Sequence, residues 1–216
     1  MLVMALDDQR IFFNVKLPFS QGGAWTNQQL VPGLGGTSTA PALAQLGGKL
    51  YMVWKGVGDD PRIFFNSTSD GQNWTHQQWA GLGIETSAAP ALVLFSDTLY
   101  LVFKAGGDDP RIFFNYTSDG IVWQGGSQFI PGGPWVLGPV LVPGVGGTSA
   151  APALAEAGGD FAELYMVWKG VGDDQRIFFN ATNNPTGGTG AWTNQQLVPG
   201  VGGTSAAPAL AWLGHG

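Results

Sequence analysis

The chain repeats itself four times, and this repetition restricts its possible folds more than any other feature. The motif Asp-Asp-x-Arg-Ile-Phe-Phe-Asn occurs at 7–14, 59–66, 108–115 and 173–180. A second motif, Thr-Ser-x-Ala-Pro-Ala-Leu, occurs at 37–43, 86–92, 148–154 and 204–210. Self-similarity at a period of roughly 50 residues is typical of architectures that place copies of one small unit side by side. The chain is therefore expected to contain four copies of a single structural unit.

Each unit predicts four short strands. Small apolar residues form the first (Ser-Ala-Ala-Pro-Ala-Leu-Ala), and an alternating β-rich run forms the second (Leu-Tyr-Met-Val-Trp-Lys). Arg-Ile-Phe-Phe-Asn is the third, and the fourth begins at a Trp. The 35 Gly and 14 Pro residues gather in the turns between these runs, and such punctuation is typical of many short strands. No segment shows a sustained helical period, so the sequence predicts an all-β fold.

The position of the repeat along the chain predicts how the units close. The chain starts at a second strand and ends just after a first strand, residues 205–212. The last strand can therefore complete the unit that the N-terminus opens, which would protect the sheet edges. We expect an all-β, four-bladed β-propeller with four antiparallel strands per blade, whose ring is closed by the C-terminal strand completing the N-terminal blade.

The expected propeller is a single domain that spans residues 1–216. Its repeats cover approximately 1–36 plus 204–216, 37–85, 86–147 and 148–203. An alternative also fits the permuted repeat: two chains join half-rings into a larger propeller, or exchange the terminal strand. The prediction is accordingly a monomer or a small homo-oligomer.

Two turns carry a family resemblance. Ser-Asp-Gly-Gln-Asn-Trp at 69–74 and Ser-Asp-Gly-Ile-Val-Trp at 118–123 resemble the Asp-box turn of sialidase-type propellers, with Asp and Trp one residue closer than usual. The whole chain is similar to the tandem-repeat propellers of sialidase-like and lectin-like proteins. This resemblance implies the propeller fold, and Asp boxes are structural turns, so it implies little about activity.

Composition excludes several functions. A formal net charge of −6 with nine Lys plus Arg leaves no basic stripe for nucleic acid. No apolar run approaches the roughly 20 residues of a membrane helix, so no membrane insertion is expected. The chain has no Cys and no calcium-loop motif, and no cofactor or metal is expected. It begins inside the repeat without a signal peptide, and its compartment stays open, a secreted or cell-surface location included.

One face of the predicted propeller carries a ring of polar residues. The turn between the second and third strands lies on the same face as the link to the next unit, because consecutive strands alternate in direction. The candidate ligand-binding residues of this ring are Asp59, Asp60, Arg62, Asp108, Asp109, Arg111, Asp173, Asp174 and Arg176. Either these Asp–Arg turns bind sugar hydroxyl groups, or each Asp caps its hairpin and pairs with its own Arg. The Lys that ends each second strand either reaches this ring or is solvated.

Aromatic residues offer flat surfaces for sugar rings. Trp54, Phe103 and Trp168 recur in the second strand and are interpreted as core between blades. Trp79 and Trp135 are not repeated and are therefore the candidate exposed contacts. The leading hypothesis is a multivalent lectin for glycans or glycoproteins, with up to one weak sugar site per blade and affinity gained through avidity.

Two other functions stay open. The first is a protein-interaction or scaffold module that would use the long insertion at 124–140, because long loops on a regular scaffold often carry function. The second, less favoured, is a glycoside hydrolase of the sialidase type. Catalysis needs a differentiated acid, base and nucleophile at one point, whereas the four Arg occupy one repeat position and the three Glu have no suggestive context. The sequence therefore predicts no catalytic residues and no enzyme.

Overall fold

The structure is a computed structural model of the 216-residue chain. It describes residues 8–16, 20, 22–129, 135–158, 162–187 and 191–213, with the backbone alone described at 126–129 and 135–137. No described segment is a helix of the length and hydropathy that a membrane span requires.

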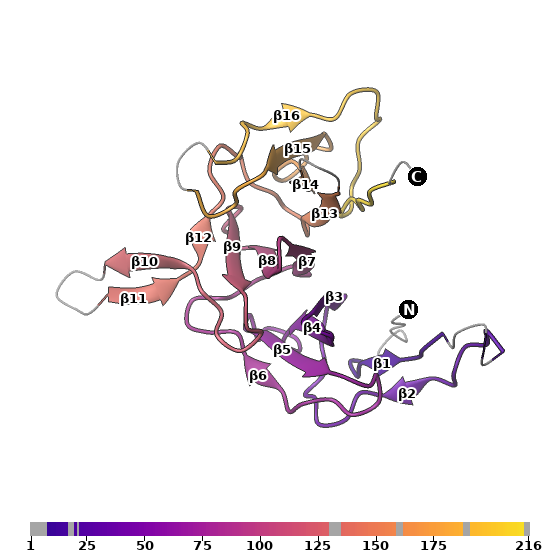
Figure 1. Cartoon of the computed structure of the whole chain (residues 1–216). Helices are drawn as coiled ribbons and strands as arrows, with labels where there is room; N and C mark the ends of the chain where they lie inside the picture. The colour runs from indigo at the N-terminus through magenta and orange to yellow at the C-terminus, as the bar shows by residue number, and fades with distance from the viewer. Residues whose placement is uncertain are drawn as a thin grey trace.

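Three sheets of four antiparallel strands form most of the molecule, each built from one copy of the repeat (Figure 1). The first contains β3 (Ala42–Leu46), β4 (Lys49–Lys55), β5 (Ile63–Thr68) and β6 (Gln78–Trp79). The second contains β7 (Ala91–Phe95), β8 (Thr98–Lys104), β9 (Ile112–Thr117) and β12 (Val140–Leu141). The third contains β13 (Ala153–Ala157), β14 (Glu163–Lys169), β15 (Ile177–Thr182) and β16 (Gln196–Leu197). The predicted all-β fold and the four-stranded antiparallel unit are confirmed.

The N-terminal sheet has two described strands, β1 (Phe12–Phe13) and β2 (Gln29–Leu30), which pair antiparallel. They correspond to the third and fourth strands of the other sheets. Residues 1–7, where the second strand was expected, lie outside the described residues. The segment 204–213 was predicted to supply the first strand, but it forms no strand and pairs with none of the described strands. The predicted closure of the ring is therefore not observed.

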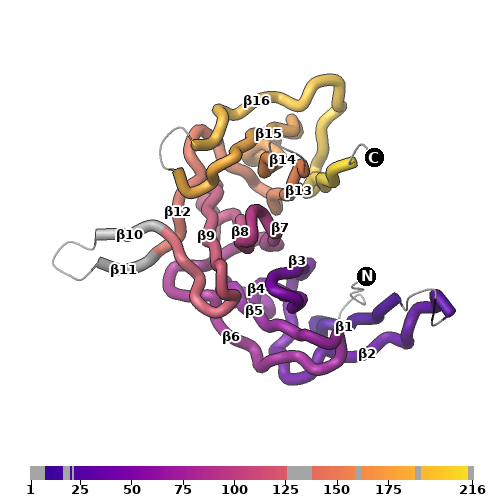
Figure 2. Tube along the Cα trace, in the orientation of Figure 1, coloured from indigo at the N-terminus to yellow at the C-terminus, as the bar shows by residue number. Residues whose placement is uncertain are grey.

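The sheets follow one another along an open arc (Figures 1 and 2). The innermost strand β7 contacts both β3 and β13, so the first strand of each unit lies on the inside of the curve, as its small residues predict. The N-terminal sheet and the C-terminal segment lie at the two ends of the arc, on the same open side.

Aromatic side chains fill the spaces between the sheets. Trp54 on β4, Phe103 on β8 and Trp168 on β14 are at most 1% exposed, which confirms them as core. Each stacks on the Phe of the next strand, with ring centroids 6.2–6.3 Å apart. β-branched and aromatic residues on both strands suit this pleated, buried surface. Between neighbouring units, Phe65 packs against Trp123 with ring centroids 5.7 Å apart, so aromatic packing also holds one sheet against the next.

The long insertion forms a separate hairpin. β10 (Gly126–Phe129) and β11 (Trp135–Gly138) pair only with each other and project away from the arc (Figure 1). The outer strand of the second sheet, β12, follows this hairpin, so the fourth strand begins well after Trp123. In every complete sheet the fourth strand is two residues long, shorter than the sequence predicts.

Candidate functional site

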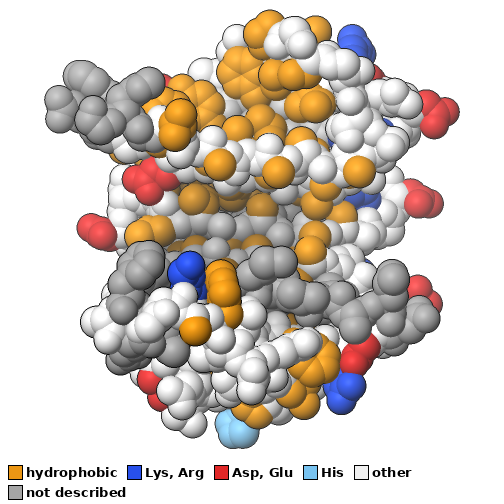
Figure 3. All heavy atoms as spheres, turned by 90° about the vertical axis from the view of Figure 1, so that its right-hand side faces the viewer, with side chains coloured by type: hydrophobic (Ala, Val, Ile, Leu, Met, Phe, Trp, Pro, Cys, Tyr) orange, Lys and Arg blue, Asp and Glu red, His pale blue; other side chains and the backbone are white. Residues whose placement is uncertain are grey.

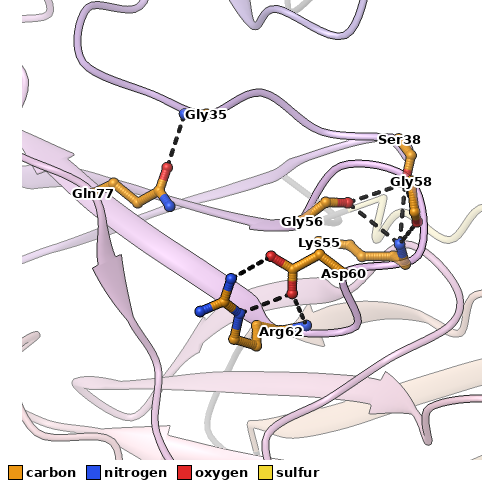
Figure 4. A network of polar contacts seen from close by, with 8 residues as sticks. All are labelled: Gly35, Ser38, Lys55, Gly56, Gly58, Asp60, Arg62 and Gln77. Carbon is orange, nitrogen blue, oxygen red and sulfur yellow. Dashed lines mark hydrogen bonds and ion pairs between the residues drawn. The ribbon is translucent and has the colours of Figure 1, made fainter.

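Each turn between the second and third strands is closed by an Asp and an Arg two residues later. In the β4–β5 turn the Asp60 carboxylate accepts hydrogen bonds from the backbone N–H, Nε and Nη2 of Arg62, at 3.1, 2.9 and 2.7 Å (Figure 4). The Arg62 guanidinium also lies over the Phe64 ring, 5.1 Å from its centroid. The same ion pairs, at 2.6–2.8 Å, join Asp8 to Arg10, Asp109 to Arg111, and Asp174 to Arg176. The second Asp of each predicted pair is thus engaged within its own turn.

The pairing keeps these carboxyl groups ionised. Hydrogen bonds from the Arg111 side chain, then its backbone N–H, lower the pKa of Asp109 to about 2. Arg176 lowers the pKa of Asp174 to about 2 in the same way. Charge-assisted, two-pronged contacts of this kind are short and directional. These carboxylates therefore carry a negative charge throughout the physiological pH range.

A buried lysine anchors the first strand to the same turn. Lys104 Nζ donates to Ser87 Oγ at 2.7 Å and to the carbonyl oxygens of Ala105 and Gly107 at 3.1 and 2.8 Å. Burial lowers the pKa of Lys104, and Asp109 partly opposes this. Lys55 makes the equivalent contact with Ser38 (Figure 4), and Lys169 makes it with Ser149. The lysines are at most 6% exposed, so they are structural ties and not solvated ends.

The other predicted site residues lie apart from these contacts. Asp59, Asp108 and Asp173 are exposed at the tips of the turns. Trp79 on β6 is 41% exposed, as expected for a contact residue. Trp135 begins β11, and its side chain lies outside the described residues. Among the predicted residues, the second Asp and the Arg of each turn are therefore paired, whereas Trp79 lies on the outer strand of its sheet.

A cavity of about 460 Å³ opens between the first and second complete sheets, and we call it the Glu85 pocket. It is lined by Pro61, Gly83, Glu85, Phe103, Ala105, Gly106, Gly107, Asp109, Arg111, Phe113 and Pro139. Glu85 comes from the link after β6, Asp109 and Arg111 from the β8–β9 turn, and Pro139 from the end of the hairpin insertion. The pocket therefore combines two carboxyl groups, a guanidinium and an aromatic wall.

Glu85 breaks the repeat. The corresponding residues of the other copies, Gly36, Gly147 and Gly203, have φ between +88° and +90°. A Cβ at Gly147 would lie 2.6 Å from the carbonyl oxygen of Pro110, so a side chain does not fit there. The link at 81–85 takes a different path, with positive φ at Gly81 and Gly83 and none at Glu85, which makes room for the glutamate.

Backbone contacts hold Glu85 at the interface between the first and second complete sheets. It forms an isolated antiparallel bridge with Arg62, and Thr86 N–H donates to the Pro61 carbonyl at 2.7 Å. Asp60 chiefly raises the pKa of Arg62, and the charge of Glu85 adds to this. Sequence reasoning set Glu85 aside with the other glutamates. The signal that could have found it is the replacement of Gly-Gly by Ile-Glu before Thr-Ser in one copy of four.

The two Asp-box turns are structural. Asp70 accepts hydrogen bonds from the backbone N–H groups of Gln72 and Asn73 at 2.8 and 2.7 Å, which lowers its pKa. Asp119 makes the equivalent bonds to Ile121 and Val122. Both carboxylates close the turn between the third and fourth strands, as the family resemblance implies.

Comparison with known proteins identifies the architecture. No protein-family profile and no curated protein matches the chain. Among solved structures, it is similar to a Penicillium chrysogenum α-L-arabinanase complexed with arabinobiose, with a TM-score of 0.62 and 16% identity, over 96% of this chain and 64% of that one. It is also similar to the GH43_1 enzyme of Xanthomonas citri complexed with xylose, with a TM-score of 0.51 and 16% identity, over 88% of this chain and 65% of that one. The fold is that of a β-propeller.

These comparisons correct the functional prediction. The lectin hypothesis, and with it the prediction that the chain is not an enzyme, is contradicted because the propellers of similar structure are glycoside hydrolases. The sialidase-like resemblance holds at the level of the propeller. At 16% identity the likeness shows the fold alone, and the chain spans less than two thirds of either enzyme.

Proposed function

We propose that this chain is a glycoside hydrolase for pentose-containing glycans and that the Glu85 pocket is its active site. One observation carries the proposal: two departures from the repeat, Glu85 and Pro139 of the insertion at 124–140, line the same pocket. A catalytic site needs such differentiation, because identical copies cannot supply an acid and a base with separate roles.

The two carboxyl groups of the pocket suit the two roles of glycoside hydrolysis. One carboxylic acid protonates the leaving oxygen, and one carboxylate activates water or attacks the anomeric carbon. Asp109 is held ionised by Arg111, with a pKa of about 2, and therefore acts as the carboxylate. Proton transfer to the leaving oxygen then falls to Glu85. Phe113 lines the pocket and is partly exposed, so it gives an apolar edge beside the two carboxyl groups.

The substrate class rests on the structural likeness. The arabinanase is described with arabinobiose and the Xanthomonas enzyme with xylose, both of which are pentose ligands. A pocket of about 460 Å³ is within the usual range of ligand sites. We infer an arabinose- or xylose-containing oligosaccharide as the substrate, and a glycan as the partner of the polar face.

Hydrolysis of aryl pentosides and of arabinan and xylan oligosaccharides tests the proposal. Replacing a catalytic carboxyl costs about 100- to 10,000-fold in turnover, so Glu85→Gln and Asp109→Asn should lose activity to this extent. Asp174→Asn is the matched control, because it breaks the same ion pair in a sheet that does not line the pocket. No turnover by the wild type, or equal activity in Glu85→Gln, would refute the assignment.

We also propose that the N-terminal sheet is a fourth blade of the single domain 1–216. Its strands β1 and β2 repeat the third and fourth strands of the complete sheets. Residues 205–212 carry the first-strand motif and are the segment that would complete this blade. The other predicted ligand residues, Trp79 and the exposed Asp of each turn among them, stay predictions.

A further inference from the structure

The C-terminal segment begins as an ordinary first strand begins. Thr204 N–H donates to the Gln175 carbonyl at 2.8 Å, as Thr148 N–H does to that of Pro110. Thr204 Oγ1 donates to the Ala206 carbonyl at 3.1 Å and accepts from the Ala206 N–H at 3.0 Å. The corresponding Thr at the start of each complete sheet makes the same turn. The segment thus begins with the same hydrogen bonds that precede the first strand of each complete sheet.

Beyond that turn the segment is unburied. Leu213 is 83% exposed and Trp212 is 50% exposed. The residues at the register position of Leu213 in the complete sheets are buried, with exposures of 9%, 2% and 6% for Leu46, Phe95 and Ala157. Leaving a leucine in water forfeits most of its transfer free energy. Leu213 therefore occupies a core position of the repeat without a core around it.

A matching cavity lies at the other end of the arc. It measures about 260 Å³ and is lined by Phe13, Asn14, Val15, Lys16, Trp25, Leu43, Leu50, Gly71 and Trp74. The repeat counterparts of four of these residues, Phe65, Leu92, Leu99 and Trp123, belong to the buried cluster that contains Leu46. The cavity thus has the walls that enclose Leu46 in the next interface, and it is the place where the counterpart of Leu46, Leu213, would fit.

We propose that this cavity receives the C-terminal segment, residues 205–213, of a second copy of the chain. The cavity and the segment lie at opposite ends of the open arc (Figure 1), and hydrophobic side chains are exposed on the open side (Figure 3). Closing the arc within one chain requires the sheets to move relative to one another, whereas the cores around Trp54, Phe103 and Trp168 are already buried and close-packed. Exchange with a second copy fills the cavity and leaves these interfaces unchanged.

The exchange is reciprocal, because a two-fold dimer brings the segment of each copy to the cavity of the other. Each chain is then both donor, through Leu213, and acceptor, through the cavity. This inference goes beyond the proposed hydrolase activity and does not depend on it, since Glu85 and Asp109 lie in a different interface.

Sedimentation velocity of the full chain over a range of concentrations tests the exchange. We expect a species of twice the 22.6 kDa chain mass. Leu213→Asp damages the donor, and Leu43→Asp damages the acceptor. Because the exchange is reciprocal, a dimer of either variant loses the burial of two leucines, which should weaken it by roughly 100- to 10,000-fold in Kd. Leu82→Asp is the control, because Leu82 is 66% exposed and lies outside both surfaces.

Mixing the two damaged variants separates exchange from closure within one chain. An equimolar mixture of Leu213→Asp and Leu43→Asp contains one intact donor and one intact acceptor, and it should form more dimer than either variant alone. Each variant is first checked for the thermal midpoint of the wild type, and Trp25→Ser replaces Leu43→Asp if that variant unfolds. A monomeric wild type, or dimers unaffected by Leu213→Asp, would overturn the proposal.

Discussion

Gly147→Ala probes how closely neighbouring sheets are joined. Gly147 has a φ of +88°, and a Cβ there would lie 2.6 Å from the Pro110 carbonyl oxygen. That oxygen accepts the 2.8 Å hydrogen bond from Thr148 N–H, which leads the chain from the second complete sheet into the third. The substitution therefore strains the backbone and pushes on the connection between two sheets at once.

The expected loss in the free energy of unfolding is the sum of four contributions. An alanine in the left-handed region costs about 1–2 kcal/mol, and the stiffer unfolded chain returns about 0.4–1 kcal/mol. Displacing the carbonyl weakens a hydrogen bond worth about 1 kcal/mol and strains the surrounding backbone by a further ~1 kcal/mol. The free energy of unfolding should fall by about 2–3 kcal/mol.

Gly172→Ala is the matched control for Gly147→Ala. Its φ is +58°, and a Cβ added at Gly172 would meet no atom within 4 Å. The left-handed backbone alone should then cost about 0.5–1 kcal/mol. Urea unfolding of both variants measures the difference. Equal losses would show that the carbonyl contact does not constrain the sheets, and the reasoning would fail.

Four further substitutions test the packing and the charges. Lys104→Met removes three charge-assisted hydrogen bonds but also the cost of burying the ammonium group, and we expect a net loss of about 2–4 kcal/mol in urea unfolding; a gain would contradict the structural role of the lysine. The pKa of Asp174 is about 2 in the folded chain and about 3.9 in an unfolded one, so the folded state binds fewer protons. This stabilisation is present above about pH 4 and is lost as the pH falls toward 2; the thermal midpoint measured between pH 6 and 2 should fall less steeply in Asp174→Asn, and an unchanged slope would count against the ion pair. Trp168→Ala should cost about 3–5 kcal/mol and Trp79→Ala less than about 0.5 kcal/mol, and similar losses in both would contradict their different burial.

Most of the fold inside each repeat could be predicted from the sequence. The short apolar run Leu-Tyr-Met-Val-Trp-Lys predicts β4, because a strand between packed sheets is buried on both faces, and residues 51–55 of β4 are all buried. The Asp-x-Arg spacing offered two interpretations, and the geometry of Asp60 and Arg62 shows the pairing within the turn.

Features that join distant segments could not be predicted. The Glu85 pocket combines a link after β6, the β8–β9 turn and Pro139, and no local pattern shows that these meet. The curvature of the arc depends on how side chains pack between sheets, so the repeat count alone did not establish whether the ring closes. In both cases the missing information is the relative placement of units that look alike in sequence.

The hydrogen bonds between Ser and Lys within each complete sheet affect how the sequence of such a chain can diverge. Lys55, Lys104 and Lys169 each bind groups of their own repeat, so the polar end of a unit is held without help from its neighbours. A duplicated repeat therefore keeps these hydrogen bonds. One interface between two sheets can then acquire new residues while the other repeats stay alike. Glu85 and Ala105 are changes of this kind, confined to a single interface. The chain can thus gain a specialised site by altering one copy and keeping the others as scaffold.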